Sequence, residues 1–419
     1  MVELGRDASR PDCRGDHAAA EVGEDGVARE LPHGHALFSG CPEDLLHLFV
    51  GELHVQRCYA LTVPESVPHS VPCGTLIAIG DSREGIASVV SAVGDIETAA
   101  GVLLAGGLVA FPTETVYGLG ANAEDLAAVA RIYQAKGRPP THPLIVHLAG
   151  AEFLDGWVAH VPEPARLLAD RFWPGPLTLV LRRGPRVSLA ATGGLETVAV
   201  RVPDHAVALA LLSAFGGGAA APSANRFGSV SPTTADHVRA ELGDAVDVVL
   251  DGGSCAVGVE STIVDATGDT PSILRPGGMT REDLEAALAQ PLAVPSTSTI
   301  RVPGTHPSHY APRAQVVLVE PEQVAAEAER TQEQGYRVGA LLPASSGTGA
   351  NVHAVVAVPD STTDYARGLY AFLRELDQRG CDLIVASLPA AEGLGLAIGN
   401  RLRRAAGPRT SDRPVTMRR

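Results

Sequence analysis

The sequence predicts an α/β protein made of two domains that are joined by a linker. The first observation is the length of 419 residues, which suits two ordinary domains. The second is that short apolar runs alternate with segments of helical periodicity, first over residues 95–290 and again over 314–408. The third is the stretch between them, 291–313, which is rich in Pro, Ser and Thr, as extended linkers are.

Residues 95–290 are predicted to form a mixed α/β domain. Helices are expected at 95–107 and 123–137, where apolar side chains recur at helical spacing and a glycine follows. Two further helices are expected between strands, at 204–215 and 232–242. Strands are expected at the short apolar runs 108–111, 143–148, 177–181, 197–202, 246–250 and 261–265. Because strands and helices do not alternate strictly, we do not expect a purely parallel, doubly wound sheet.

Residues 314–408 alternate more regularly and predict a smaller, Rossmann-like α/β domain. Its strands are expected at 315–319, 337–343, 352–358 and 382–388, and its helices at 321–334, 362–380 and 393–406. The two ends of the chain lack such patterns. We expect residues 1–94 to be a poorly ordered extension of unknown role, and 409–419 to be a disordered tail.

Composition and charge exclude several classes of protein. The net charge of −15 argues against a general nucleic-acid-binding protein, because nonspecific phosphate binding needs a broad basic face. No apolar run reaches the roughly 18–20 residues of a membrane helix, and the first residues do not resemble a signal peptide. The six cysteines show no paired spacing. We therefore expect a cytoplasmic enzyme with reduced thiols and no membrane partner.

Basic and hydroxyl side chains gather at the expected ends of strands and helices in the first domain. Neither GxxxxGK[ST] nor GxGxxG occurs there, so the domain lacks a standard nucleotide-binding motif. Each polar residue alone is a weak signal, since such serines commonly lie in turns and such arginines at solvated edges. Together, four cations and several hydroxyls predict a pocket for a strongly anionic ligand, and these residues are Thr113, Thr115, Lys136, Arg138, Arg201, Ser223, Asn225, Ser261 and Arg275.

Lys136 is the single lysine among 33 lysine and arginine residues. A lysine ammonium is a compact point charge that can lie among several phosphate oxygens, whereas arginine presents a planar fork. A single lysine can also persist by chance. Its place two residues before Arg138, in a chain that otherwise uses arginine, nevertheless favours a functional role.

Several segments resemble the YrdC-like family of threonylcarbamoyl-AMP synthases. In order, they are FPTETVYGLG, KGRPPTHPLIVH, WPGPLTLVL, APSAN and GVESTIVD. The linker ending in HYAP and the final GLGLAIGNRLRRAA resemble the longer, two-domain branch of that family, so that the resemblance covers residues 95–408. It implies a YrdC-like mixed, twisted-sheet domain, followed by a linker and a smaller Rossmann-like domain.

The resemblance also implies a reaction, in which a nucleotidyltransferase converts L-threonine, bicarbonate and ATP into L-threonylcarbamoyl-AMP and pyrophosphate. Mg²⁺ is expected to accompany ATP, and we assign no metal-ligating residue. The product would pass to a transferase that forms threonylcarbamoyladenosine next to the anticodon of tRNA. Weak or no direct tRNA binding is expected of the chain itself.

Roles for single residues follow from the same resemblance. Lys136 and Arg138 are expected to be catalytic and to face the ATP phosphates. Further ATP contacts are expected from His142, Thr197, Asn225, Arg275, Tyr310 and Ser231 or Thr233, between which the sequence does not choose. L-Threonine is expected to contact Thr115, His147, Arg201, Ser223 and Ser261. Arg201 is the natural partner of its carboxylate, and Tyr310 of the linker is expected to close over the nucleotide as a lid.

Some positions depart from the family's pattern or allow a second interpretation. His142 stands where the family usually has asparagine, which would make part of the binding pH-dependent near the ordinary histidine pKa of ~6.5. The linker lacks the basic residues that many relatives carry before HYAP. Glu114 and Glu260 could be catalytic acids or structural hydrogen-bond partners, and His147 could be a buried core histidine.

Two other functions remain open from the sequence. An O-carbamoyltransferase shares the YrdC-like fold and uses a carbamoyl-adenylate, but the domain that follows HYAP favours the synthase. An RNA-binding module is suggested by the basic final helix and tail, which contain Arg401, Arg403, Arg404 and Arg409. The acidic total and the lack of basic stripes interleaved with aromatic residues count against this function.

Overall fold

The computed structural model describes residues 95–295, 301–304, 309–346 and 350–407. All the described residues belong to one compact unit. The predicted extension over 1–94 and the predicted tail over 409–419 lie outside the described residues. Within the described ranges, no helix is both long and apolar enough to cross a membrane.

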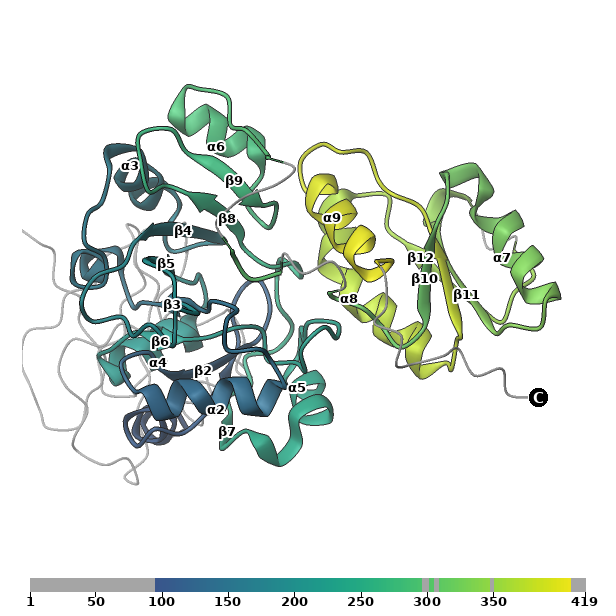
Figure 1. Ribbon diagram of the computed structural model, residues 1–419. Helices are drawn as coiled ribbons and strands as arrows, with labels where there is room; N and C mark the ends of the chain where they lie inside the picture. The colour runs from purple at the N-terminus through teal and green to yellow at the C-terminus, as the bar shows by residue number, and fades with distance from the viewer. Residues whose placement is uncertain (1–94, 296–300, 305–308, 347–349, 408–419) are drawn as a thin grey trace, which may run out of the picture. The chain divides into compact units, whose positions relative to one another are not determined.

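Within the described residues, nine strands form one mixed sheet in the order β7-β1-β2-β6-β3-β5-β4-β8-β9 (Figure 1). Three neighbouring pairs are parallel, namely β1 with β7, β3 with β5, and β4 with β8, and the other pairs are antiparallel. The expectation of a mixed sheet is therefore confirmed. The strands are β1 Val109–Phe111, β2 Gly118–Asn122, β3 Ile145–His147, β4 Leu177–Arg182, β5 Thr197–Arg201, β6 Ala219–Ala220, β7 Val248–Val249, β8 Thr262–Asp265 and β9 Ser272–Arg275.

Helices flank this sheet. Helix α2 packs against β2, α5 against β7, and α3 against β4 and α6. The helices are residues 95–104, α2 Leu126–Lys136, α3 Glu163–Phe172, α4 Ala206–Phe215, α5 Ala235–Leu242 and α6 Arg281–Leu288, with short 3₁₀ turns at Ala151–Gly156 and Gly243–Ala245. Strands β2, β6 and β9 and helices α3 and α6 were not predicted. Strand β2 reads GLGAN, and its glycines hide the strand pattern.

The second sheet is parallel throughout, in the order β10-β13-β11-β12, which confirms the Rossmann-like prediction. Helix α7 packs against β11 and β13, while α8 packs against β12 and α9 against β10, so that helices cover both faces (Figure 1). The elements are β10 Gln315–Leu318, α7 Val324–Glu333, β11 Val338–Pro343, β12 Ala354–Val358, α8 Thr362–Gln378, β13 Leu383–Ala386 and α9 Gly395–Ala405, with 3₁₀ turns at Pro321–Gln323 and Ala344–Ser346.

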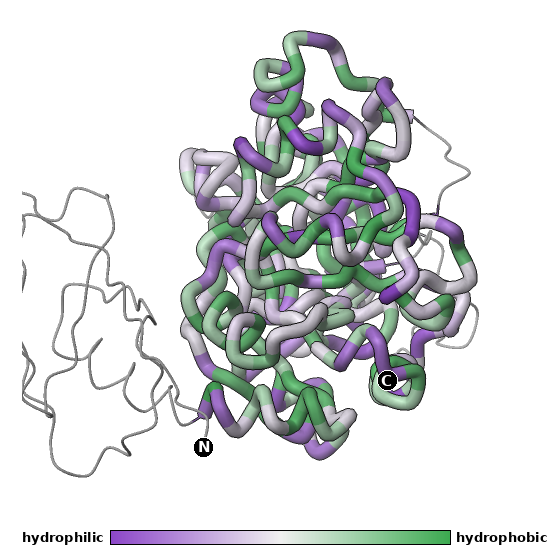
Figure 2. Tube along the Cα trace, turned by 90° about the vertical axis from the view of Figure 1, so that its left-hand side faces the viewer, coloured by the Kyte–Doolittle hydropathy of each residue, from purple (hydrophilic) through white to green (hydrophobic). Residues whose placement is uncertain are grey.

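Apolar strand residues form the core of the first sheet. Leu177, Leu179 and Leu181 of β4 and Val198 and Val200 of β5 are buried together. Figure 2 shows hydrophobic stretches alternating with hydrophilic connections along the trace. Because strand interiors fill the core, polar side chains are left at the strand ends and in the connections that follow them.

Candidate active site

A pocket that encloses about 500 Å³ of empty space, part of it open to solvent, lies at these strand ends. Residues of the linker, among them His309 and Tyr310, complete its wall. Nine of the residues proposed from sequence line it, namely Thr113, Thr115, Arg138, His147, Arg201, Ser223, Ser261, Arg275 and Tyr310. The structure therefore brings together residues that are up to 197 positions apart in the chain, from Thr113 to Tyr310.

The parallel pairing of β3 with β5 brings His147 and Arg201 side by side. The two residues are register partners at the carboxyl ends of their strands. Arg201 is 3% exposed, its Nε donates to the Gly175 carbonyl oxygen at 3.2 Å, and its Nη2 lies 2.6 Å from Glu114 Oε1. Glu114 thus orients Arg201, which favours the structural interpretation of this carboxylate over that of a catalytic acid.

His147 is a neutral imidazole at this position. Burial, and then the charge of Arg201, lower the pKa of His147 to about 3. Among the described residues, no hydrogen-bond partner faces its Nδ1 atom. The Nδ1 atom of a neutral imidazole can donate a hydrogen bond to, or accept one from, a polar group of a bound molecule. Because this atom lacks a partner in the part of the chain that the structure describes, the interpretation of His147 as a core histidine with all its hydrogen bonds made is not favoured.

Hydroxyl groups form the wall next to Arg201. Thr113 Oγ1 donates to the Val116 carbonyl oxygen at 2.6 Å and lies 2.8 Å from Thr115 Oγ1, which shapes the turn between β1 and β2. Ser261 Oγ lies 2.7 Å from Thr178 Oγ1 of β4. Thr115 and Ser261 are buried and line the pocket, so both can hydrogen-bond a polar ligand.

Arg275 lies at the end of β9 and is 3% exposed. Its Nη2 donates to the Ser261 carbonyl oxygen at 2.7 Å, and its Nη1 donates to the Pro303 carbonyl oxygen at 3.1 Å. The guanidinium therefore joins the strand ends to the linker. Burial lowers the pKa of Arg275, which means that the site holds this cation at a cost that an anionic ligand would offset.

Lys136 and Arg138 are positioned by the carboxyl end of α2. Gly137 has φ +62°, the left-handed conformation that ends many helices, and Arg138 N donates to the Tyr133 carbonyl oxygen at 2.9 Å. Arg138 reaches the pocket wall, where its Nη2 donates to the Pro143 carbonyl oxygen at 2.8 Å and its guanidinium lies 5.8 Å from the centre of the Phe227 ring. Burial lowers its pKa to about 10.

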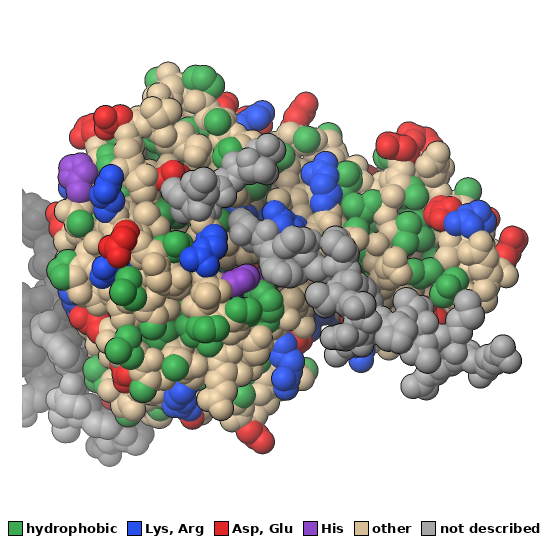
Figure 3. Space-filling view, in the orientation of Figure 1, with side chains coloured by type: hydrophobic (Ala, Val, Ile, Leu, Met, Phe, Trp, Pro, Cys, Tyr) green, Lys and Arg blue, Asp and Glu red, His purple; other side chains and the backbone are tan. Residues whose placement is uncertain are grey.

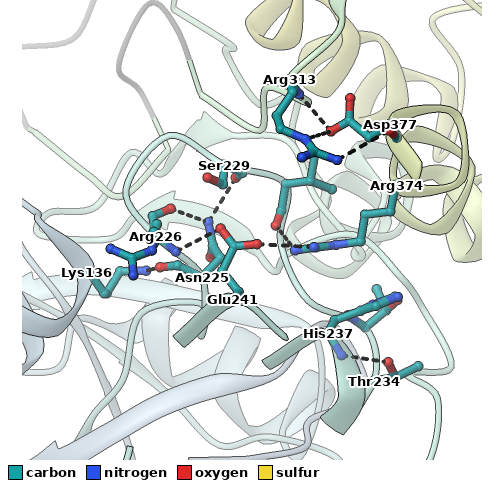
Figure 4. Close-up of polar contacts among 12 residues, drawn as sticks. Lys136, Asn225, Arg226, Ser229, Thr234, His237, Glu241, Arg313, Arg374 and Asp377 are labelled. Carbon is teal, nitrogen blue, oxygen red and sulfur yellow. Dashed lines mark hydrogen bonds and ion pairs between the residues drawn. The ribbon is translucent and has the colours of Figure 1, made fainter. Parts of the chain in front are cut away.

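Lys136 is buried behind the wall and does not line the pocket itself. Its Nζ donates to the Ser223 carbonyl oxygen at 2.5 Å. It also donates to the Asn225 carbonyl oxygen (Figure 4). Burial, and then the charge of Arg138, lower the pKa of Lys136 well below its ordinary value. In this conformation the ammonium holds the APSAN segment in place, and its expected contact with ATP phosphates stays a prediction.

The other proposed ATP contacts do not line the pocket wall. Thr197 begins β5, at the opposite end of the strand from Arg201. The His142 ring lies edge-on to Phe227, and the Asn225 amide nitrogen donates to the carbonyl oxygens of Arg226 and Ser229. Ser231 Oγ donates to Glu260 Oε1 at 2.6 Å, whereas Thr233 Oγ1 lies 3.4 Å from His237 Nδ1. Both Ser231 and Thr233 thus remain candidates.

Glu260 is the centre of a buried network that the sequence did not predict. Its carboxylate accepts from Ser231 Oγ, from the Tyr370 hydroxyl at 2.7 Å and from Arg401 Nε at 2.6 Å. Burial would raise the pKa of Glu260, but the charges of Arg401 and Arg275 outweigh it and lower the pKa to about 2. Glu260 is therefore ionised at neutral pH, which argues against its use as a general acid.

Arg401 does not support the alternative of an RNA-binding module. Its position in a basic final helix suggested an RNA-binding surface, yet its side chain is 1% exposed and paired with Glu260. A signal was present, because Arg401 follows Ile398 and precedes Ala405 on the apolar face of α9. Figure 3 shows basic side chains scattered singly among acidic and uncharged ones on the face in view, which is unlike a nucleic-acid-binding face.

Comparison with known proteins identifies the family. The threonylcarbamoyl-AMP synthase of Pyrococcus abyssi is 44% identical over 326 residues, which are 75% of this chain and 94% of that protein. The chain belongs to the threonylcarbamoyl-AMP synthase family. The family's enzyme from Bacillus subtilis is 43% identical over 327 residues, which are 75% of this chain and 93% of that enzyme. These enzymes are nucleotidyltransferases.

Family models and a solved structure extend the match to both domains. Residues 101–277 match the Sua5_yciO_yrdC model, described as telomere recombination, and residues 279–407 match the C-terminal domain of threonylcarbamoyl-AMP synthase. The crystal structure of P. abyssi Sua5 complexed with L-threonine matches with a TM-score of 0.71 at 43% identity, covering 74% of this chain and 94% of that one. The threonylcarbamoyl-AMP synthase fold is therefore confirmed in both domains.

Proposed function

We propose that the chain converts L-threonine, bicarbonate and ATP into L-threonylcarbamoyl-AMP and pyrophosphate. The observation that carries this proposal is the meeting of three arginines, Arg138, Arg201 and Arg275, in one buried pocket with hydroxyl side chains. The reaction needs such a site, because a carboxylate, a carbamate and a triphosphate must share it. Family membership and the likeness to the L-threonine complex of P. abyssi Sua5 support the choice of substrates.

We assign the L-threonine subsite to the part of the pocket around Arg201. Its guanidinium, oriented by Glu114 and Gly175, can form a charge-assisted pair with the amino-acid carboxylate. Neutral His147 and the hydroxyl groups of Thr115, Ser223 and Ser261 can hydrogen-bond the remaining polar groups. Val116 and Ile145 provide apolar surface in the same wall.

We assign the ATP phosphates to the part around Arg138 and Arg275. Both guanidinium groups are buried, and within the described residues Arg138 Nε has no hydrogen-bond partner. Two fixed cations can stabilise the charge that moves from the α-phosphate to the leaving pyrophosphate. Tyr310 would cover the nucleotide, and Lys136 would keep the Ser223–Asn225 backbone in place.

The chemistry that follows needs positioning more than a reactive side chain. The threonine amine adds to bicarbonate with loss of water, or to CO₂ with loss of a proton, to give a carbamate. A carbamate oxygen then attacks the α-phosphorus, and the bond from that phosphorus to the β-phosphate oxygen breaks to release pyrophosphate. The arginines align three anions that would otherwise repel one another, and burial keeps water from the adenylate.

We propose that Mg²⁺ enters with ATP and is held mainly by phosphate oxygens and water, as is usual for this ion. The carboxylates nearest the pocket fit this arrangement. Glu114 contacts Arg201 and Glu260 accepts from Arg401, so both are engaged by arginines. The product would pass to a transferase that modifies tRNA in the cytoplasm.

The test is pyrophosphate release by the purified full-length protein with ATP and Mg²⁺. Release should require both L-threonine and bicarbonate, and the mixture should contain the mass of threonylcarbamoyl-AMP. Release that requires carbamoyl phosphate instead would indicate that the protein is an O-carbamoyltransferase. Binding of tRNA with steep salt dependence, without threonine-dependent cleavage of ATP, would favour an RNA-binding module.

A further inference from the structure

Glu260 is a carboxylate of the pocket wall that the C-terminal domain contacts directly. Glu260 lines the pocket and directly precedes Ser261, but its side chain accepts hydrogen bonds from α8 and α9. Tyr370 of α8 donates to both carboxylate oxygens, at 2.9 and 2.7 Å, and Arg401 of α9 donates to Oε2 at 2.6 Å. The four side chains Ser231, Glu260, Tyr370 and Arg401 are all buried.

Arg401 also contacts two other segments of the chain, at Pro276 and at Tyr310. Its Nη1 donates at 2.7 Å to the carbonyl oxygen of Pro276, the residue after Arg275. Its guanidinium also lies 5.0 Å from the centre of the Tyr310 ring, where a cation–π contact is favourable. One side chain of the C-terminal domain therefore contacts residues in or beside three parts of the pocket wall.

The backbone around Glu260 is fitted closely to the same helices. Gly258 has φ +79°, and a Cβ atom placed there would lie 2.4 Å from Arg367 Cα in α8. Val259 is fully buried in an apolar cluster that includes Leu369 of α8 and Ile398 and Leu402 of α9. The segment that carries Glu260 and Ser261 is therefore held from behind by α8 and α9.

We propose that Arg401 and Tyr370 are positioning residues for the anionic pocket and act on it through the carboxylate of Glu260. A buried carboxylate that loses its cation must protonate or move, because an uncompensated buried charge is costly. Movement of Glu260 would displace Ser261 and release the Ser231 hydroxyl. Without Arg401, Glu260 would instead lie next to the phosphates as an extra negative charge. This inference rests on the proposed function.

The test compares Arg401→Gln, Tyr370→Phe and the control Arg403→Gln, which changes an exposed arginine of the same helix. Steady-state pyrophosphate release is measured against ATP and against L-threonine for the full chain. We expect Arg401→Gln to raise the KM values for ATP and L-threonine by about 3–30-fold, with a smaller change in kcat. Substitutions that act on a binding site through a chain of intervening side chains typically have effects of this size. Tyr370→Phe should have a smaller effect in the same direction, and Arg403→Gln should match wild type.

A pH profile separates positioning from simple loss of folded protein. The titratable or charged groups that face Glu260 are Arg401, Arg275, Tyr370, Tyr310 and His309. Removing the Arg401 charge should let Glu260 protonate at higher pH, so that the ratio of kcat/KM of Arg401→Gln to that of wild type changes between about pH 4.5 and 6. Taking the ratio cancels the titration of the substrates, which both proteins share. The double variant Glu260→Gln with Arg401→Gln removes both charges and should reverse part of the KM increase that Arg401→Gln causes.

The outcomes are distinct. Unchanged KM values and pH profiles in both Arg401→Gln and Tyr370→Phe would overturn the positioning role while wild-type synthesis stands. If Arg401→Gln does not fold, as thermal unfolding would show, Tyr370→Phe and the double variant decide. A wild-type protein without threonine-dependent release would instead refute the proposed function.

Discussion

At the scale of single residues, Lys136 has a structural reason to be a lysine. Its ammonium donates to the carbonyl oxygens of Ser223 and Asn225 and is almost completely buried. A compact cation on a flexible stem can approach two convergent carbonyls, whereas a guanidinium is broader and planar. The same two hydrogen bonds hold the APSAN segment, which contributes Ser223 to the pocket.

We expect Lys136→Met to lower kcat/KM by at least about 10-fold, because hydrogen bonds to charged groups are worth about 1.5–3 kcal/mol each. Lys136→Arg should be clearly impaired as well, since the fork does not fit between the two carbonyls. The measurement is threonine-dependent pyrophosphate release. Arg131→Ala, which changes an exposed residue of the same helix, is the control and should retain activity. Wild-type rates for Lys136→Arg would refute the steric explanation.

His147 makes the fold sensitive to acid. Its folded-state pKa is about 3, below the ordinary value of 6.5 for histidine. Between these two values the unfolded chain binds a proton that the folded chain does not, so the free energy of unfolding falls as the pH falls, by up to about 1.4 kcal/mol per pH unit. Over the same range, activity should show no titration of His147.

We therefore expect His147→Gln to flatten the dependence of unfolding free energy on pH between about 6.5 and 4. Chemical denaturation at several pH values measures this slope. His160→Gln removes an exposed histidine and is the matched control, which should keep the wild-type slope. Equal slopes in wild type and His147→Gln would show that the imidazole is not held neutral in the folded protein.

At the scale of elements, the carboxyl end of α2 determines where two of the cations lie. Asp125 caps the amino end by accepting from Ala127 N at 2.8 Å, and Gly137 ends the helix in a left-handed conformation. This turn separates Lys136 from Arg138, so that one is held behind the pocket wall and the other reaches it. A helix continued by one more turn would carry Arg138 away from both positions.

Gly137→Ala tests this role against a matched site. Gly216 ends α4 in the same left-handed conformation, and at both glycines an added Cβ atom would meet no atom within 4 Å. Each alanine variant should lose about 1 kcal/mol of stability through backbone strain alone. Only Gly137→Ala should also lower kcat/KM, because only that turn positions catalytic cations. Equal activity in the two variants would contradict this role.

At the scale of the whole molecule, the described pocket is built from residues between Thr113 and Tyr310 and is supported from behind by α8 and α9. Both family models begin after residue 100, since they cover residues 101–277 and 279–407. Catalysis should therefore depend on both domains, and not on the part of the chain that precedes them.

We expect a chain without residues 1–90 to release pyrophosphate with the kcat and KM of the full chain. The reason is that every residue assigned to catalysis or positioning lies beyond this segment. A chain that ends at residue 313 is the contrasting variant, because it loses Tyr370 and Arg401 and should bind substrates poorly if it folds. A large loss on removal of residues 1–90 would mean that this segment contributes to the enzyme.

The sequence by itself determined the fold class, the family and nine side chains of the pocket wall. Apolar periodicity is a local property, so the strands at 177–181 and 197–202 and the helix at 123–137 could be predicted from it, and they are found as β4, β5 and α2. Strand β6, with only two residues, and the glycine-containing β2 carry too little local signal to be predicted.

Only the tertiary structure decided how these side chains act on one another. Register places His147 beside Arg201, and burial keeps that histidine neutral. Chain folding brings Arg401 to Glu260 across 141 positions in sequence. Electrostatic partners and burial depend on contacts between distant segments, and local sequence patterns do not contain that information. For this reason a basic residue expected at a surface is a buried partner of the active-site wall.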